Sequence, residues 1–247
     1  MGNDTNYNQL QNPGSAYAGA TAPAAPAPAK QPPTKTQTLP EVSFVFYVLS
    51  SAVTKATKTF IENSIAMVQY IWKPRQEEDN YDAVKKFAVT SKWDGTFKTI
   101  DDKNDFYKRI DYPLNKPSDK TLSLIKDNFS NPNFDPIVPV FICYAAWDEA
   151  NEPGTPRDGL LRGFTLVRAL PWFTGERAIL LFASTAGPKT LAHELSHWCG
   201  FTHAQFKDDP ANIGYIGGGG FGIDREQLRK YFKWATELSF RKTIGTN

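Results

Sequence analysis

The sequence has few of the residues that mark several protein classes. Only two of its 247 residues are cysteine, which excludes a disulfide scaffold and leaves at most one bond, between Cys143 and Cys199. The formal net charge is only +2, and lysine and arginine are not gathered in clusters. A nucleic-acid surface would show such clusters, so we expect no nucleic-acid partner.

Long apolar runs are also missing. No run approaches the roughly 18 residues that a membrane-spanning helix needs, so we expect no membrane span. Residues 1–10, MGNDTNYNQL, have neither the basic start nor the apolar stretch of a secretory signal peptide. Either a signal peptide has been removed from this numbering, or any export uses another route.

Bulky apolar residues are scarce in the first 40 residues, which are rich in proline and alanine. Such a segment cannot bury enough surface to offset the entropy of ordering, so we expect a disordered leader over 1–40 and a folded domain over 41–247. The leader is either a simple tether or an address for a secretion or injection apparatus. In the second case the protein is a secreted or delivered effector or toxin; otherwise it stays in the cytoplasm.

Apolar patterns in the remaining chain predict an α+β domain. We expect buried strands over 42–50, 137–147, 163–170 and 176–184, and helices over 55–72 and 224–239. Residues 75–135 give only weak signals. The charges of Arg162 and Arg168 suit the edge of a sheet, so we expect 163–170 to be an edge strand, where an extended substrate can add as a further strand.

The informative segment is His193-Glu194-Leu195-Ser196-His197, preceded by Pro188, which suits a first helical turn with Ser184 or Thr185 near the cap. Residues four apart lie on one face of a helix, so His193 and His197 can hold one metal ion together. Glu194 lies about 100° further around the helix. It can therefore take a proton from an attacking water without joining the ligands.

His203 is the third candidate ligand. On a continuous helix it would lie about 15 Å along the axis from His193, so the helix must end between His197 and His203. Gly200 is placed to end it, because glycine adopts the left-handed conformation without strain. Three histidines leave one tetrahedral position open, which is typical of a catalytic zinc site. These are the only histidines in the chain.

This HExxHxxGxxH string resembles the zinc signature of the metzincin metallopeptidases. The resemblance implies Zn²⁺ bound by His193, His197 and His203, with Glu194 as the general base. It also implies a zincin-like fold, with a twisted mixed sheet, an active-site helix and a small C-terminal subdomain over 204–247.

One feature departs from the metzincin pattern. The family has a methionine turn beneath the metal, but both methionines here, Met1 and Met67, lie upstream of the motif. The segment Asn212–Tyr215 is the positional substitute, with Ile213 or Gly214 in place of the methionine. By the same resemblance Tyr215 is either a side chain that touches the metal or the oxyanion, or a packing residue in the turn.

A second resemblance is to the aspzincin peptidases, in the phrase TLAHELSHW over 190–198. These enzymes take their third ligand from an aspartate, and Asp208 or Asp209 would then replace His203. Both resemblances imply the same reaction, the hydrolysis of peptide bonds in a protein or peptide substrate. The alternative from another class is a non-catalytic zinc-binding cargo or adhesion module.

Overall fold

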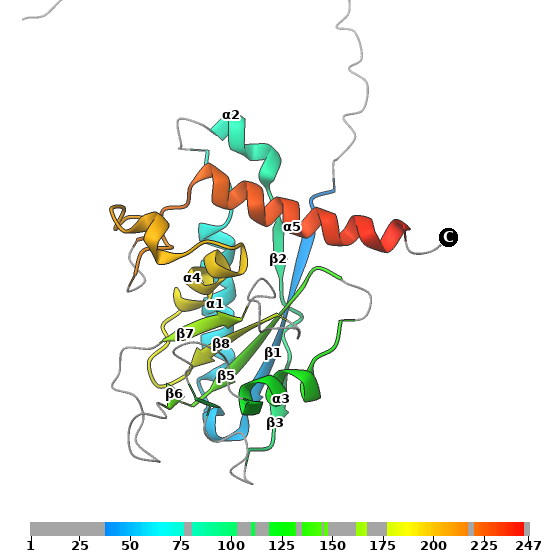
Figure 1. Cartoon of the computed structure of the whole chain (residues 1–247), viewed down its shortest axis with the longest axis vertical. Helices are drawn as coiled ribbons and strands as arrows, with labels where there is room; N and C mark the ends of the chain where they lie inside the picture. Colours follow the sequence, from blue (N-terminus) through cyan, green and yellow to red (C-terminus); the bar gives the residue numbers. More distant parts are fainter. Residues whose placement is uncertain are drawn as a thin grey trace, which may run out of the picture. The chain divides into compact units, whose positions relative to one another are not determined.

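A twisted, mixed β-sheet lies at the centre of the described residues (Figure 1). The computed structural model describes residues 38–76, 81–102, 110–111, 119–131, 135–144, 146–147, 162–166, 177–216 and 220–244. The sheet contains β1 (Glu41–Leu49), β2 (Thr90–Lys92), β3 (Phe97–Ile100), β5 (Ile137–Cys143), β7 (Gly163–Leu166) and β8 (Ala178–Phe182). A separate parallel pair joins β4 (Ile110–Asp111) and β6 (Ala146–Trp147).

The strands follow the order β2-β1-β5-β8-β7, and β3 also pairs with β1. The strands β2 and β3 pair with opposite ends of β1, at Glu41–Ser43 and Phe46–Leu49. All pairings in this sheet are parallel except that of β7, which is antiparallel to β8. Among the described residues β7 pairs only with β8, so it lies at the edge, as predicted for 163–170. Residues 167–170 lie outside the described residues.

Helices cover both faces of this sheet. They are α1 (Thr57–Ile71), α2 (Tyr81–Val84), α3 (Asp119–Asn128), α4 (Thr190–Trp198) and α5 (Arg225–Ile244), with short 3₁₀ turns at Ser50–Ala52, Lys85–Phe87 and His203–Phe206. Two separate hydrophobic cores result, because alternate side chains of a strand point to opposite faces. Val42, Phe44, Phe46 and Val48 of β1 belong to the first core, and Tyr47 and Leu49 belong to the second.

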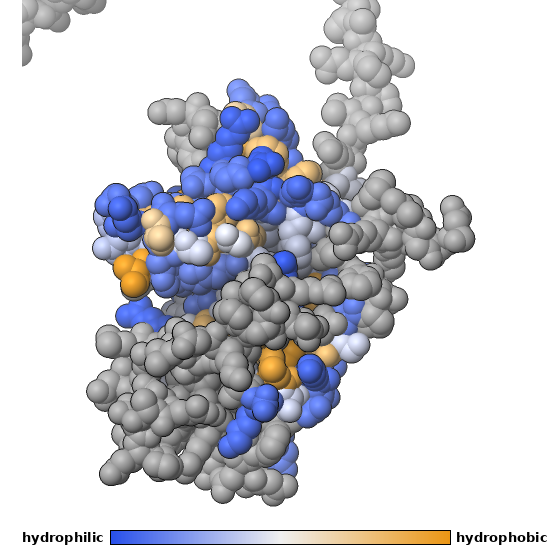
Figure 2. All heavy atoms as spheres, viewed as in Figure 1, coloured by the Kyte–Doolittle hydropathy of each residue, from blue (hydrophilic) through white to orange (hydrophobic). Residues whose placement is uncertain are grey.

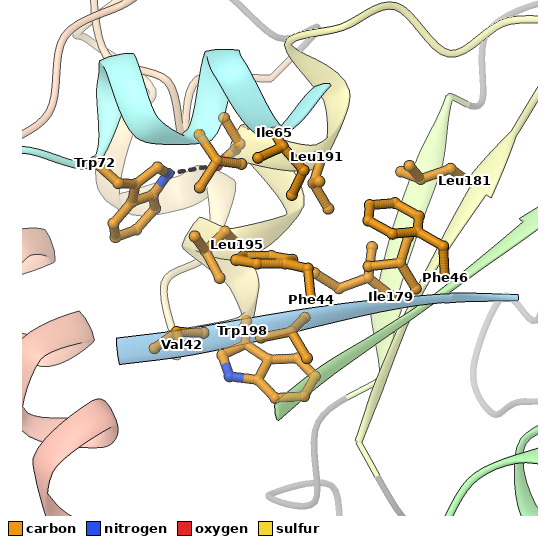
Figure 3. Packing of buried hydrophobic residues seen from close by; sticks show 14 of the residues in the cluster. Val42, Phe44, Phe46, Ile65, Trp72, Ile179, Leu181, Leu191, Leu195 and Trp198 are labelled. Atoms are coloured by element: carbon orange, nitrogen blue, oxygen red, sulfur yellow. Dashed lines mark hydrogen bonds between the residues drawn. The ribbon is translucent and has the colours of Figure 1, made fainter. Parts of the chain in front are cut away.

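The first core joins the sheet to α1, α4 and α5. Figure 3 shows Leu191, Leu195 and Trp198 of α4 among side chains from α1, β1 and β8. The indole Nε1 of Trp72 donates a hydrogen bond to the Ala192 carbonyl at 2.9 Å, which ties the end of α1 to α4. The second core lies under α3, through Leu124 and Ile125.

The structure confirms the predicted fold class, an α+β fold with a twisted mixed sheet. Its C-terminal part shares the first core with the rest of the domain, through Ile213, Tyr231 and Ala235. The helix predicted over 224–239 is α5, and the Asp224 Oδ1 caps its first turn by accepting from the Gln227 amide at 2.7 Å. Residues 1–37 of the predicted leader lie outside the described residues.

The helix that carries His193 and His197 begins later than predicted. It starts at Thr190, and Ser184, Thr185 and Pro188 all precede it. The Gly187 amide donates to Thr190 Oγ1 at 3.0 Å, while the Thr190 amide donates to the Gly187 carbonyl at 2.9 Å. This reciprocal pair closes a turn before the helix, so neither Ser184 nor Thr185 caps it.

The described surface in the view of Figure 2 is mainly hydrophilic, with small separate hydrophobic spots. Large apolar side chains that are exposed include Leu39, Val53, Tyr70, Tyr144, Ile216 and Phe221. In the described part of the chain, none of the helices has both the length and the apolar character needed to cross a membrane.

Candidate metal centre

Helix α4 carries two of the three histidines on one face. His193 and His197 are four residues apart, and their rings lie 4.9 Å apart between centroids. Leu191 and Leu195 turn the opposite side of the helix into the first core, where both are fully buried. The packing therefore fixes which face of α4 the histidines occupy.

Gly200 ends this helix as the sequence predicts. Its φ of 83° lies in the left-handed region that side chains disfavour. The Gly200 amide donates to the His197 carbonyl at 2.8 Å, and the Phe201 amide donates to the Ser196 carbonyl at 3.1 Å. This pair of bonds is the Schellman arrangement, which reverses the chain direction and satisfies carbonyls at the helix end.

A second local motif places His203. Thr202 and Gln205 form a capping box, in which the Thr202 amide donates to Gln205 Oε1 at 2.7 Å. His203 is the first residue of the short 3₁₀ turn that this box begins. Two local motifs, one that ends a helix and one that starts a turn, therefore bring His203 back to α4.

The three histidines meet at their Nε2 atoms. The Nε2–Nε2 distances are 3.2 Å between His193 and His197, 3.1 Å between His193 and His203, and 3.1 Å between His197 and His203. Ligands about 2.0–2.1 Å from a tetrahedral zinc ion would lie about 3.3 Å apart, so the spacing fits such an ion. Their donor atoms lie close enough together for the three side chains to hold one metal ion.

The hydrogen bonds of the rings support the same conclusion. Nδ1 of His193 lies 2.6 Å from the Ile213 carbonyl, and Nδ1 of His197 lies 2.8 Å from the Phe201 carbonyl. A carbonyl only accepts, so each Nδ1 carries the proton and each Nε2 presents a lone pair. Two lone pairs that face each other at 3.2 Å repel, and a cation between them removes that repulsion.

Burial keeps these rings neutral. Desolvation, and secondarily the neighbouring His197, lowers the pKa of His193 to about 4. Desolvation also lowers the pKa of His197, and desolvation followed by His197 lowers that of His203. Neutral imidazole is the form that binds metal ions, so the site is ready to bind one at neutral pH.

Glu194 lies on the side of α4 that faces the edge strand β7. Its side chain is almost fully buried, and Thr165 Oγ1 lies 2.7 Å from its Oε2. Burial raises the pKa of Glu194 to about 8, although the Thr165 hydrogen bond opposes this. A divalent cation at the histidines would lower this pKa, because a nearby positive charge favours the carboxylate.

The turn predicted to replace the methionine turn lies against His193. Ile213 is fully buried, and its carbonyl is the partner of His193 Nδ1. Asn212 Oδ1 accepts from the Gly214 amide at 2.8 Å, and Asn212 Nδ2 donates to Gln227 Oε1 at 2.9 Å. The segment therefore orients the His193 ring through a backbone carbonyl.

Gln227, in α5, connects the turn at Asn212–Tyr215 to α4. Its Nε2 donates to Ser196 Oγ on α4 at 3.1 Å, while its Oε1 accepts from Asn212. The Asp224 amide also donates to Gln227 Oε1, at 3.0 Å. Gln227 and Ser196 are fully buried, so their mutual bonds replace water.

The other predicted site residues lie around this centre. Tyr215 is half-buried in the turn, where its amide donates to the Asn212 carbonyl at 3.2 Å. Asp208 and Asp209 are both exposed, and the group of donor atoms that could hold a metal contains His203 and neither aspartate. The ligand roles, the base and any part for Tyr215 stay predictions.

The two cysteines are both free thiols, so the bond left open by the sequence does not form. Trp198 belongs to the first core, and Cys199, at the end of α4, packs against it. Cys143 belongs to the second core instead.

Sequence reasoning missed the partners of the predicted residues. Thr165, Ser196 and Gln227 carry no motif, since their roles come from contacts between distant segments. The carbonyls of Ile213 and Phe201 have no side-chain signature at all. The sequence predicted a strand over 163–170, but it did not predict that Thr165 faces α4.

Comparisons with known proteins show a distant likeness to a solved structure. No family model matches the chain, and none of the curated proteins matches it. Among solved structures the chain is similar to metalloproteinase-II from Bacteroides fragilis, with a TM-score of 0.49 and 16% sequence identity. The match covers 81% of this chain and 55% of that one, so the chain spans about half the length of that protein.

Proposed function

We propose that this protein is a zinc-dependent endopeptidase, with His193, His197 and His203 as ligands and Glu194 as general base. The observation that carries the proposal is the convergence of three Nε2 atoms, two of them with lone pairs fixed by hydrogen bonds at Nδ1. Three imidazoles suit zinc, and they leave one tetrahedral position for a water or a substrate.

The residues of this chain would divide the reaction between them. Bound zinc would supply Lewis acidity, which lowers the pKa of a water to about 7 and polarises the scissile carbonyl. Glu194 takes a proton from the attacking water while the water oxygen forms a bond to the carbonyl carbon. Glu194 then passes the same proton to the leaving nitrogen as the C–N bond breaks. Its burial excludes bulk water that would compete for the proton.

The edge strand supports a peptide as substrate. Among the described residues β7 pairs on one side only, with β8, and its inner face touches Glu194. An extended peptide can add its main-chain hydrogen bonds to such an edge. A peptide docked there would lie beside the base, which is the geometry that cleavage within a chain requires.

Metal analysis combined with digestion of a disordered protein tests this proposal. The purified full chain, loaded with zinc and freed of excess metal, should hold about one zinc per chain and cleave casein or a peptide library. A chelator should stop cleavage, and added zinc should restore it. Bound zinc without any cleavage would favour the non-catalytic cargo or adhesion module. A chain that binds no zinc would contradict both functions.

We also propose that residues 1–40 are an address read by a secretion or injection apparatus, which makes the protein an effector or toxin. The support is composition, because a Pro- and Ala-rich segment is poor in the apolar groups that a folded unit needs. The test is deletion of residues 1–37, which keeps Pro40, whose carbonyl accepts from the Thr90 amide at 2.8 Å. Zinc binding and cleavage should persist while delivery stops. Normal delivery of the truncated protein would contradict the address.

A further inference from the structure

The inner face of β7 is built around the side chain of Glu194. Phe164 and Leu166 belong to the second core, so the alternating positions Gly163 and Thr165 point to the α4 face. A Cβ placed at Gly163 would lie 3.2 Å from Glu194 Cγ and 2.8 Å from the Leu180 carbonyl oxygen. A side chain at position 163 would therefore displace Glu194 or the strand, and glycine leaves the space that the glutamate occupies.

Thr165 supplies the polar contact in the same space. Its Oγ1 lies 2.7 Å from Glu194 Oε2 and 2.8 Å from the Glu194 main-chain oxygen. Among the described residues it is the one side chain that hydrogen-bonds this carboxylate. A buried carboxylate with a single partner depends strongly on that partner, because water does not replace it.

The Thr165 hydroxyl is placed to hold one oxygen of this carboxylate. It has one proton to donate, and Oε2 accepts it across 2.7 Å. Among the described residues no side chain hydrogen-bonds the other oxygen, Oε1, so Oε1 is the oxygen left to take a proton from water. The bond at Oε2 can persist while Oε1 carries that proton, because Oε2 still accepts.

We propose that Thr165 is a positioning residue for Glu194, whose hydroxyl holds the carboxylate in place on α4. This inference rests on the proposed function, since it assigns a partner to the proposed base. No proton is gained or lost by Thr165 itself. The proton that leaves the water goes to Glu194 and then to the leaving nitrogen, while the hydroxyl keeps its bond to Oε2.

The same geometry predicts which kinetic constant changes. Substrate would pair with the main chain of β7 at its open edge, while the Thr165 side chain points to α4. Loss of the hydroxyl should therefore lower kcat and leave KM almost unchanged. Zinc affinity should also stay unchanged, because Thr165 contacts Glu194 and none of the three histidines.

The test uses the zinc-loaded full chain and a fluorogenic peptide taken from the digest. Thr165→Val keeps the shape without the hydroxyl, Thr165→Ser keeps the hydroxyl, and Thr99→Val changes an exposed threonine in β3, on the far side of β1. We expect Thr165→Val to lower kcat by about tenfold to a hundredfold, which is part of the 10²–10⁴ typical of a general base. KM and zinc affinity should stay within about twofold, and Thr165→Ser should recover most of kcat.

Wild-type kcat in Thr165→Val would overturn the inference. So would equal loss in Thr165→Val and Thr165→Ser, since that points to packing. If Thr165→Val does not fold, Thr165→Ala against Thr165→Ser decides by the same criteria. An inactive wild-type chain would overturn the proposed function together with this inference. Full activity in Thr165→Val beside an inactive Glu194→Gln would overturn this inference alone.

Discussion

The two faces of the central sheet bury different kinds of side chain. The face under α3 is packed by apolar residues such as Leu124, Ile125 and Phe141. The face under α1, α4 and α5 has an apolar core too, but it also buries Glu194, Ser196 and Gln227 beside the histidines. Buried polar groups cost free energy unless they are paired, so their concentration on one face marks where the chemistry lies.

We infer that one face mainly stabilises the fold and that the other also holds the proposed metal site. Among the described residues, the α3 face contributes no side chain to the group of three histidines. The α4 face packs on the same sheet and also orients His193 and His197, through the carbonyls of Ile213 and Phe201. Substitutions on the first should change stability alone, and substitutions on the second should change the metal site.

The largest expected effect is the loss of metal from the α4 face. His203→Ala removes one of three nitrogen ligands, so zinc affinity should fall by more than about a hundredfold, which exceeds the range for residues outside the ligand shell. Asp208→Ala and Asp209→Ala should leave zinc affinity unchanged, because both side chains are exposed. Competition with a fluorescent chelator measures the zinc affinity of all three variants. Loss of zinc in either aspartate variant, with His203→Ala unaffected, would support the aspzincin resemblance instead.

The next effect is on the stability of the metal-free protein and concerns the buried carboxylate of Glu194. Burial raises the pKa of Glu194 to about 8, against an ordinary value of 4.5. The stability that its protonated form provides is complete below about pH 4.5 and is lost as pH rises through about 8. Glu194→Gln lacks this loss, so at pH 9 it should be more stable than the wild type by on the order of 5 kcal/mol.

Urea unfolding at pH 5 and pH 9 measures this difference. The shifts of the three histidines are common to both proteins and cancel in the comparison. At pH 5 most of this difference should be absent, because the folded wild type keeps Glu194 protonated there. An equal difference at both pH values would show that Glu194 does not titrate as its burial implies.

The smallest expected effect is a change in zinc affinity, tested by one substitution on each face of the sheet. Gln227→Leu removes the bonds that join Ser196 of α4 to Asn212, so the Ile213 carbonyl loses support. Zinc affinity should fall by about tenfold to a hundredfold, as for other residues that orient a ligand. Leu124→Ala on the α3 face should cost about 2–5 kcal/mol of stability and leave zinc affinity unchanged.

Zinc titration and urea unfolding of both variants measure this contrast. If Leu124→Ala weakened zinc binding as much as Gln227→Leu, the separation of the two faces would be wrong.

The sequence predicted the parts that local chemistry determines. Long apolar runs identified β1, β5 and β8, and the spacing of histidines with Gly200 identified the turn that returns His203. The strands β2 and β3 were missed, because three or four mostly polar residues become strands only by pairing with β1. The Ser196–Gln227 bond was missed for the same reason, since it joins segments 31 residues apart.

Zinc content and turnover of Glu194→Gln, measured on one preparation, test the central claim most directly. Glu62→Gln, an exposed glutamate on α1, is the matched control. Glu194→Gln should bind about as much zinc as the wild type and lose about 10²–10⁴-fold in kcat, while Glu62→Gln keeps both. Wild-type turnover by zinc-loaded Glu194→Gln would contradict the assignment of Glu194 as the base.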